Sequence, residues 1–284
     1  MVGERTEEGF RALTLESRAL GGIEAIFVPE AGMVCCSLRH RGEELLGQRG
    51  GLARYVDSGS TMGIPFLHPW ANRLGRSRFE LAGREVDLEL DGGLHLKRDG
   101  EGLPMHGLLT AAPGWGVERH LELEGEEDGG VLAASFDFGA YPRLVEAFPF
   151  PHRVEIEATL AGAVLRIVTT VRVGAARLPV AFGFHPYLQL PGVERSEWEI
   201  EAPVRERLEL DERMLPTGVA ARNLRSRADR WGRGRLTMPS SRRSKWPPSC
   251  SQAAAGAWSC EWARATRSPR STRRRISPRS LSSR

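Results

Sequence analysis

Apolar and polar residues alternate along much of the first 221 residues, in short runs separated by turn residues. In residues 78–90 and again in residues 152–173, two alternating runs flank an Ala-Gly pair. Alternation with a period of two is typical of strands that bury one face of an antiparallel sheet. A short Gly-containing break between two such runs is typical of a hairpin turn. Both segments are therefore predicted to be β-hairpins.

Further strand candidates are distributed over the same part of the chain. They are residues 22–30, 34–40, 116–125, 130–138, 178–184 and 197–210. No segment shows a convincing amphipathic helical period, which favours an all-β fold over an α/β fold. No repeat of fixed period is present, which argues against a propeller or a solenoid. We predict a large antiparallel β-sandwich.

The composition changes sharply near residue 222. Residues 222–284 contain 17 of the 40 Lys and Arg residues but 2 of the 36 Asp and Glu residues, so this segment carries a formal charge of +15 and residues 1–221 carry −11. The segment has no Val, Phe or Tyr, yet it holds four of the seven Trp and two of the four Cys. We predict an incomplete β-sandwich domain over residues 1–221 and an anomalous Arg/Ser/Pro-rich tail over residues 222–284.

Three interpretations of the tail compete. A disordered basic tail would bind phosphates by releasing counterions, but disordered tails are usually poor in aromatic residues. A small folded domain would need an apolar period, and none is present. Translation of GC-rich DNA in a shifted reading frame would yield Arg, Ser, Pro and stray Trp and Cys. We favour the shifted frame over the basic tail, and the alternative reading frames of the coding DNA would decide between them.

Charge and cysteine usage limit the classes of function. Because the first 221 residues are acidic, no nucleic-acid partner is expected, and the basic tail is the weak counter-argument. The N-terminus carries charges of both signs, and no apolar run is long enough to span a bilayer, so we expect a cytoplasmic protein without a membrane partner. Cys35, Cys36, Cys250 and Cys260 lack a C-x-x-C spacing, which favours structural thiols over a metal site.

Three patches carry residues suited to chemistry. The first, residues 63–75, presents Asn72 and Arg73 on a proline-containing loop ahead of a predicted hairpin, where binding residues are often found. The second contains His106, which is followed by glycine. In the third, His185 precedes a proline, which holds it extended among aromatic neighbours. Taken singly, Asn72 and Arg73 are equally well explained by a structural role, and for His106 and His185 a structural role is the better explanation.

In order and spacing the three patches resemble the aldose 1-epimerase (galactose mutarotase) family. Members show an Asn-Arg pair after a proline-containing loop, a His-Gly pair about thirty residues later and a His-x-Tyr/Phe-x-x-Leu motif about eighty residues beyond it. The matching residues here are Asn72-Arg73, His106-Gly107, and His185 with Tyr187 and Leu190. A Leu-Pro-Thr-Gly segment at residues 215–218 also fits, so that the resemblance covers roughly residues 20–220.

The resemblance implies a galactose mutarotase-like supersandwich that interconverts the α and β anomers of a free aldohexose. It implies neither a metal nor an organic cofactor, and its partner would be the sugar itself. By the family pattern, His185 is the acid that protonates the ring oxygen and His106 assists there with a hydrogen bond. Arg73 and Asn72 would bind sugar hydroxyls, and Tyr187 is an aromatic candidate for contact with the pyranose.

One catalytic part of the family pattern is missing. Members carry their general base, a glutamate, near the C-terminus in a Phe-Glu-Pro-like context, and Glu261, the only glutamate after residue 212, stands in no such context. We therefore expect an isomerase whose activity is impaired. The alternative is a non-catalytic carbohydrate-binding or sugar-sensing module, which would bind sugar without exchanging its anomers.

Overall fold

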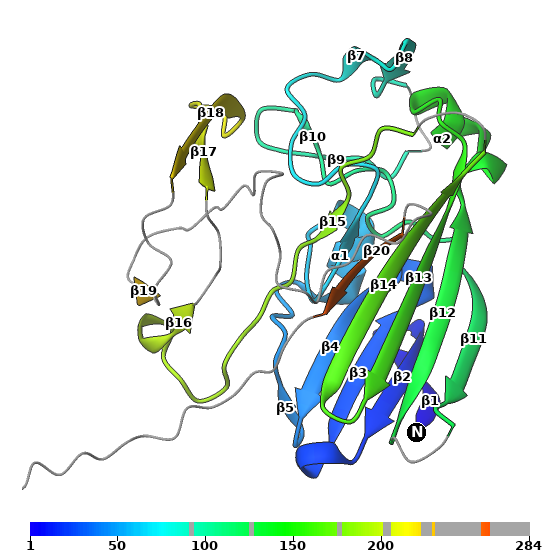
Figure 1. Cartoon of the computed structure of the whole chain (residues 1–284), viewed down its shortest axis with the longest axis vertical. Coiled ribbons are helices and arrows are strands. Elements are labelled where there is room, and N and C mark those ends of the chain that lie inside the picture. Colours follow the sequence, from blue (N-terminus) through cyan, green and yellow to red (C-terminus); the bar gives the residue numbers. More distant parts are fainter. Residues whose placement is uncertain are drawn as a thin grey trace, which may run out of the picture.

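Two antiparallel five-stranded sheets form the body of the protein (Figure 1). The structure, a computed structural model, describes residues 1–90, 94–124, 128–174, 178–200, 206–222, 229–230 and 257–261. Consecutive strands pair as neighbours in the first sheet, in the order β1 (Val2–Glu7), β2 (Phe10–Ser17), β3 (Ile23–Val28), β4 (Val34–His40) and β5 (Glu43–Glu44). The predicted strands in residues 22–30 and 34–40 are thus confirmed, and β1 and β2 precede them.

The second sheet contains the longest strands. Its order is β11 (Gly116–Glu122), β12 (Gly129–Asp137), β13 (His152–Ala161), β14 (Val164–Val173) and β20 (Ala257–Glu261). β13 and β14 form the predicted hairpin, in which Ala161 pairs with Val164 across the turn. The all-β sandwich prediction is confirmed.

The core lies between the facing sheets. β2 contacts β12 and β13, and the alternating pattern directs one face of each strand inward. One cluster of buried side chains joins Leu13 and Leu15 of β2 with Phe136 of β12 and Ile156 of β13. Burial of a side chain of this size contributes about 1.5–3 kcal/mol to the stability of the fold. The packed sheets therefore support the loops at one end of the sandwich.

A short helix covers the other face of the first sheet. α1 (Gly51–Ser58) buries Leu52 and Tyr55 in a second, smaller apolar cluster with residues of β3 and β4. The Tyr55 hydroxyl accepts a hydrogen bond from the Ala111 N–H at 3.0 Å. A second helix, α2 (Pro142–Ala147), follows β12. Helices of eight and six residues are shorter than the 11–18 residues over which a helical period is usually recognised.

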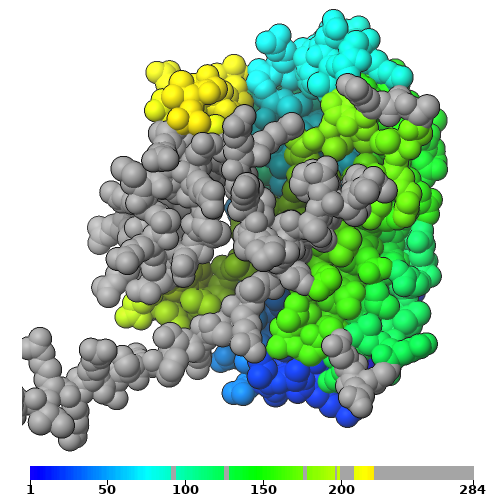
Figure 2. All heavy atoms as spheres, in the orientation of Figure 1, coloured from blue at the N-terminus to red at the C-terminus, as the bar shows by residue number. Residues whose placement is uncertain are grey.

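Short strands and loops lie beyond one end of the two sheets, where they form the cyan region at the top of Figures 1 and 2. They comprise β7 (Arg78–Leu81), β8 (Arg84–Asp87), β9 (Lys97–Arg98) and β10 (Pro104–Met105). β7 and β8 form the first predicted hairpin. β6 (Phe66–Leu67) pairs with β15 (Gly183–Phe184) nearby. Of the strand predicted over residues 178–184, only β15 forms a ladder, and Pro179 has no N–H to donate to one.

The remaining strands belong to the C-terminal part of the chain. They are β16 (Glu199–Ile200), β17 (Glu206–Leu210), β18 (Pro216–Arg222) and β19 (Asp229–Arg230). In the tail, β20 pairs with β14 and so covers part of its edge, with Arg166 opposite Glu261. Apart from β20, the described tail residues are Arg222 at the end of β18 and the two residues of β19. The rest of the tail lies outside the described part of the chain, so the domain division at residue 222 and the shifted reading frame stay predictions. Among the described residues no helix has the length and apolarity needed to cross a membrane.

Candidate active site

One extended segment, residues 65–73, organises the candidate site, and we call it the central loop. On one side it runs along the strand that bears His185: Phe66 pairs with Phe184 through β6 and β15, and the His185 N–H donates to the Pro65 carbonyl at 3.2 Å. Further along, the Ala181 N–H donates to the Pro69 carbonyl at 2.8 Å. These backbone bonds fix the position of His185 relative to the central loop.

His106 is held on the other side of the central loop. Its N–H donates to the Asn72 carbonyl at 2.9 Å, and the His68 carbonyl accepts the N–H groups of Leu108 and Leu109 at 2.7 and 3.1 Å. Gly107 makes this close approach possible: its φ is +78°, and a Cβ there would lie 2.1 Å from the His68 oxygen. The central loop therefore brings together two histidines that are far apart in the sequence.

The two imidazoles meet edge to face. The ring centroids of His106 and His185 are 5.6 Å apart, with an angle of 77° between the ring planes. Tyr187 stacks on His185 with a centroid distance of 4.7 Å, and its hydroxyl shares a 2.6 Å hydrogen bond with the Thr61 hydroxyl. The Arg49 guanidinium lies over the Tyr187 ring at 4.9 Å. Because its ring already has these two partners, Tyr187 is better placed to orient His185 than to stack on a sugar.

Both imidazoles are neutral at neutral pH. Burial lowers the pKa of His106 to about 3, and the charges of His185, Lys97 and Arg73 act in the same direction. The pKa of His185 is lowered chiefly because surrounding atoms shield the ring from water, and the charges of Arg49 and Lys97 add to this. His106 is a poor base under these conditions, and its N–H is suited to hydrogen bonding.

Arg73 and Asn72 stand beside the histidines. The Arg73 Nε donates to the Asp99 carboxylate at 2.7 Å, and its Nη1 donates to the Asn72 side-chain oxygen at 3.3 Å. Arg73 also forms a β-bridge with Met105, the residue before His106. Burial alone would raise the pKa of Asp99, but the Leu103 N–H and the Arg73 guanidinium bond to its carboxylate and the pKa is lowered overall. Asp99 is therefore an ionised partner of Arg73.

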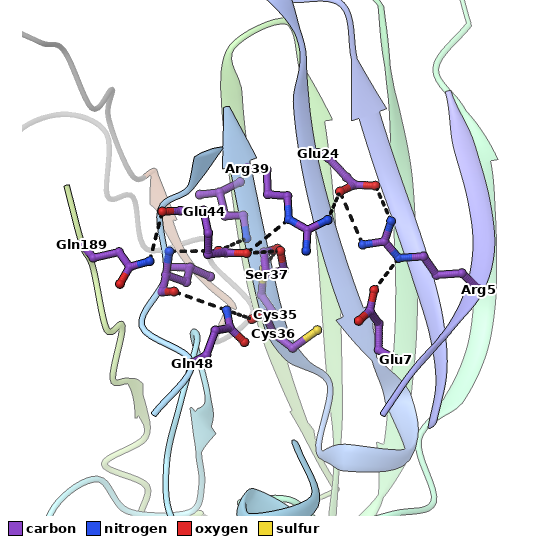
Figure 3. Close-up of polar contacts among 12 residues, drawn as sticks. Arg5, Glu7, Glu24, Cys35, Cys36, Ser37, Arg39, Glu44, Gln48 and Gln189 are labelled. Carbon is purple, nitrogen blue, oxygen red and sulfur yellow. Dashed lines mark hydrogen bonds and ion pairs between the residues drawn. The ribbon is translucent and has the colours of Figure 1, made fainter. Parts of the chain in front are cut away.

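The segment that follows His185 is fastened to the first sheet (Figure 3). Gln189 donates from its side chain to the Glu44 carbonyl at 3.1 Å. The Gln189 N–H donates to the Leu45 carbonyl at 2.9 Å, and the Gly47 N–H donates to the Tyr187 carbonyl at 2.6 Å. This strand-like pairing ties the His185 segment to residues 44–47, at the end of β5.

Glu44 is the centre of the polar network in Figure 3. Its carboxylate accepts hydrogen bonds from the Ser37 hydroxyl at 2.5 Å and from the Leu38 and Leu46 N–H groups, each at 3.0 Å. The Arg39 guanidinium forms an ion pair with the same carboxylate at 3.4 Å. With its acceptors used within the first sheet, Glu44 supports the site without facing it.

The structure gathers all five residues predicted for the site, Asn72, Arg73, His106, His185 and Tyr187, around the central loop. Two other aromatic residues, Trp115 and Trp70, lie in the core, and each is 6% exposed. Sequence reasoning missed Thr61, Arg49, Lys97 and Asp99, because each reaches the site through contacts between distant segments. Among the described residues there is no cluster of three or more His, Cys, Asp or Glu that could hold a metal ion, and Cys35 and Cys36 are buried free thiols.

Stability should fall as the pH is lowered below 6.5, because the depressed histidine pKa values favour proton uptake by the unfolded chain. With a folded pKa of about 3 against an ordinary 6.5, His106 alone should remove about 2 kcal/mol between pH 7.5 and pH 5. Urea unfolding at the two pH values measures this loss. In His106→Gln the pH dependence should be weaker, and an unchanged dependence would show that His106 is accessible to protons in the folded protein.

The sandwich and the site together define a class of protein, the galactose mutarotase-like β-sandwiches. The chain belongs to the aldose 1-epimerase family, since the family model described as aldose 1-epimerase matches residues 25–236. The resemblance seen in the sequence over roughly residues 20–220 is thereby confirmed. A search of curated protein sequences finds no match.

Solved structures agree with this fold. A galactose mutarotase-like protein from Clostridium acetobutylicum is 17% identical, with a TM-score of 0.65 over 78% of this chain and 64% of that chain. An aldose epimerase homologue from C. elegans is 18% identical, with a TM-score of 0.57 over 76% and 65% of the two chains. A galactose mutarotase related enzyme from Lactobacillus acidophilus is 17% identical, with a TM-score of 0.58 over 77% and 64%.

The alignments cover less than two thirds of each of these related structures, between 64% and 65% of their length. At identities of 17% and 18% the likeness establishes the fold. What the chain does with that fold follows from its own residues and is proposed below.

Proposed function

We propose that the protein interconverts the α and β anomers of a free aldohexose by acid–base opening of the ring. The observation that carries the proposal is the contact between His106 and His185 in a member of the aldose 1-epimerase family. Their rings meet edge to face, with the ring centroids 5.6 Å apart. Arg73 and Asn72 lie on the adjoining end of the central loop, where the guanidinium can bind two neighbouring hydroxyls.

The proposed reaction needs one proton delivered and one removed. His185 in its protonated form gives a proton to the ring oxygen, the bond from that oxygen to the anomeric carbon breaks, and the anomeric hydroxyl loses its proton as it becomes an aldehyde. Rotation about the adjacent carbon–carbon bond and reclosure invert the centre. His106 stays neutral because burial lowers its pKa to about 3, and it supports the ring oxygen through its N–H.

The proton on the anomeric hydroxyl has no protein base among the described residues of the site. The Asp99 carboxylate is held by the Arg73 guanidinium, whose Nε lies 2.7 Å from one of its oxygens, and so it is not free to act as that base. Proton removal would then pass to water. Since a positioned general base typically contributes about 10²–10⁴ in rate, we propose that this chain is a slow member of its family.

The proposed mechanism predicts that the rate falls as the pH rises. The pKa of His185 is lowered from its ordinary value by shielding from water, so its acid form declines above that pKa and is a minor species at neutral pH. We expect kcat/KM, corrected for the buffer reaction, to decrease steadily from pH 6 to pH 8. A profile that rises over this range would indicate a protein base and would contradict the proposed role of water.

The direct test is polarimetry of α-glucose and α-galactose with purified protein. A rate above that of buffer, proportional to the protein concentration, would support the proposal. Arg73→Lys is a useful companion, because it keeps the charge but removes the planar fork and should raise KM more than it lowers kcat. A rate equal to that of buffer for both sugars would exclude anomer exchange of these hexoses.

A second candidate function is sugar binding without catalysis. Two observations that would slow anomer exchange favour this second function. Both imidazoles are neutral, and the Asp99 carboxylate is bonded to the Arg73 guanidinium. Titration calorimetry distinguishes the two functions, since binding of glucose or galactose without anomer exchange would identify a binding or sensing module.

A further inference from the structure

Two further histidines meet inside the protein, beneath the candidate site. The Nε2 atoms of His68 and His152 are 2.6 Å apart, and the two residues are 0% and 5% exposed. His152 also directs its Nδ1 at the Phe150 carbonyl, at a distance of 2.6 Å. Neither histidine belongs to the family pattern seen in the sequence, and the proposed reaction uses neither.

The contacts determine where the protons of this pair lie. A carbonyl oxygen can only accept, so the Nδ1 of His152 must carry a proton. In neutral His152 the Nε2 is then an acceptor, and His68 must donate from its own Nε2. Burial, together with the proximity of the two rings, lowers the pKa of His68 well below its ordinary value, and burial also lowers that of His152. The pair is therefore neutral, with a single arrangement of its protons.

This arrangement leaves one buried polar atom unsatisfied. The Nδ1 of His68 has no hydrogen-bond partner among the described residues. An unpaired buried polar atom destabilises the folded state, and two apolar rings of similar size would avoid that cost. Stability alone therefore does not explain why a histidine pair occupies this place in the core.

The pair joins the central loop to the sandwich. His68 lies in the middle of the loop, and its carbonyl accepts the N–H groups of Leu108 and Leu109 next to His106. His152 is the first residue of β13, and its ring stacks on Phe138 at a centroid distance of 4.5 Å. A directional bond between the two rings sets the position of the loop against a rigid strand, which apolar contact alone would leave adjustable.

We propose that the His68–His152 hydrogen bond is a positioning device that sets the separation of the two reactive imidazoles, His106 and His185. The inference deepens the proposed function, on which it rests for its catalytic readout. His68 and His152 are positioning residues, because both would act through the central loop and both are buried in the core.

Phenylalanine variants separate positioning from stability. His152→Phe keeps a ring to stack on Phe138 but leaves the buried His68 N–H without an acceptor, so the melting temperature and the rate should both fall. The double variant His68→Phe/His152→Phe also removes the stranded His68 N–H and shares with the single variant only the loss of the donor to the Phe150 carbonyl, so its melting temperature should rise above that of His152→Phe, towards that of the original protein. We expect its kcat to remain at least about 10-fold low with KM little changed, because a misplacement of 1 Å can cost about 100-fold.

Two further variants complete the set. His152→Gln can still accept from His68 through its side-chain oxygen, and it should keep kcat within about threefold of the original value. His40→Phe is the matched control, because it removes a surface histidine whose ring bonds to a backbone carbonyl, here the Leu20 carbonyl. This variant should leave the rate unchanged. If kcat of the double variant recovers together with its melting temperature, the pair is merely structural and the proposal is overturned.

Nuclear magnetic resonance of ¹⁵N-labelled histidine tests the proposal without catalysis. In the original protein the ring signals should show a protonated Nε2 on His68 and a protonated Nδ1 on His152. In the double variant the ring signals of His106 and His185 should shift or broaden, and unchanged signals would overturn the proposal. If the original protein does not accelerate mutarotation, the proposed function fails, and these ring signals alone decide whether the pair positions the two imidazoles.

Discussion

Replacement of His185 by alanine should lower kcat/KM for mutarotation by about 10²–10⁴, the usual contribution of a positioned general acid. The variant removes the imidazole that meets the ring of His106, whereas His106 itself is buried and keeps a neutral ring. The fold should tolerate the change. His185 is bound to the central loop through its backbone N–H, which alanine retains.

The measurement is polarimetric, with the buffer rate subtracted and the melting temperature followed in parallel. Tyr187→Phe is the matched variant: it preserves the ring that stacks on His185 and removes only the hydroxyl bonded to Thr61. We expect it to keep most of the activity. If His185→Ala retains the full rate while remaining folded, His185 is not the acid, and the sugar-binding function becomes the better explanation.

Much of the fold could be predicted because the alternation of apolar and polar residues along a strand indicates which of its faces is buried. The hairpins of β7 with β8 and of β13 with β14 were predictable from this pattern and a central Gly. β1 and β2 also form a hairpin, with a turn at Glu8-Gly9. The prediction did not include these two strands, although the glycine-containing turn between them is visible in the sequence. α1 has eight residues, fewer than the window over which a helical period is usually recognised, and its place on the first sheet is decided by tertiary contact.

The site could be predicted only in part, because the sequence reveals residue types and spacing but few distant contacts. The pairing of Arg73 with Asp99 depends on how the loops beyond the sheets fold over one another. The same holds for His68 and His152, which are separated by 84 positions in the chain and meet at 2.6 Å. His68 lies four residues before Asn72 in the sequence, yet its ring faces the core and its carbonyl supports His106.

Substitution of Gly107 by alanine should both destabilise the protein and lower its activity. At φ +78° an alanine is strained by roughly 1–2 kcal/mol. Its Cβ would also lie 2.1 Å from the His68 carbonyl oxygen. No side-chain rotation can relieve this contact, because the oxygen belongs to the backbone and the position of a Cβ is fixed by its own backbone. The loop that carries His106 must therefore move away from the central loop, and a shift of 1 Å can cost about 100-fold in rate.

Gly83→Ala is the matched control. Gly83 lies in the turn between β7 and β8 with a nearly identical φ of +76°, and a Cβ there would meet nothing within 4 Å. Urea unfolding should therefore show a loss of roughly 1–2 kcal/mol for Gly83→Ala and a larger loss for Gly107→Ala, with full activity kept only in the first. Equal losses in the two variants would mean that the His106 loop has room to accept a side chain, and that its close contact with His68 does not determine where His106 lies.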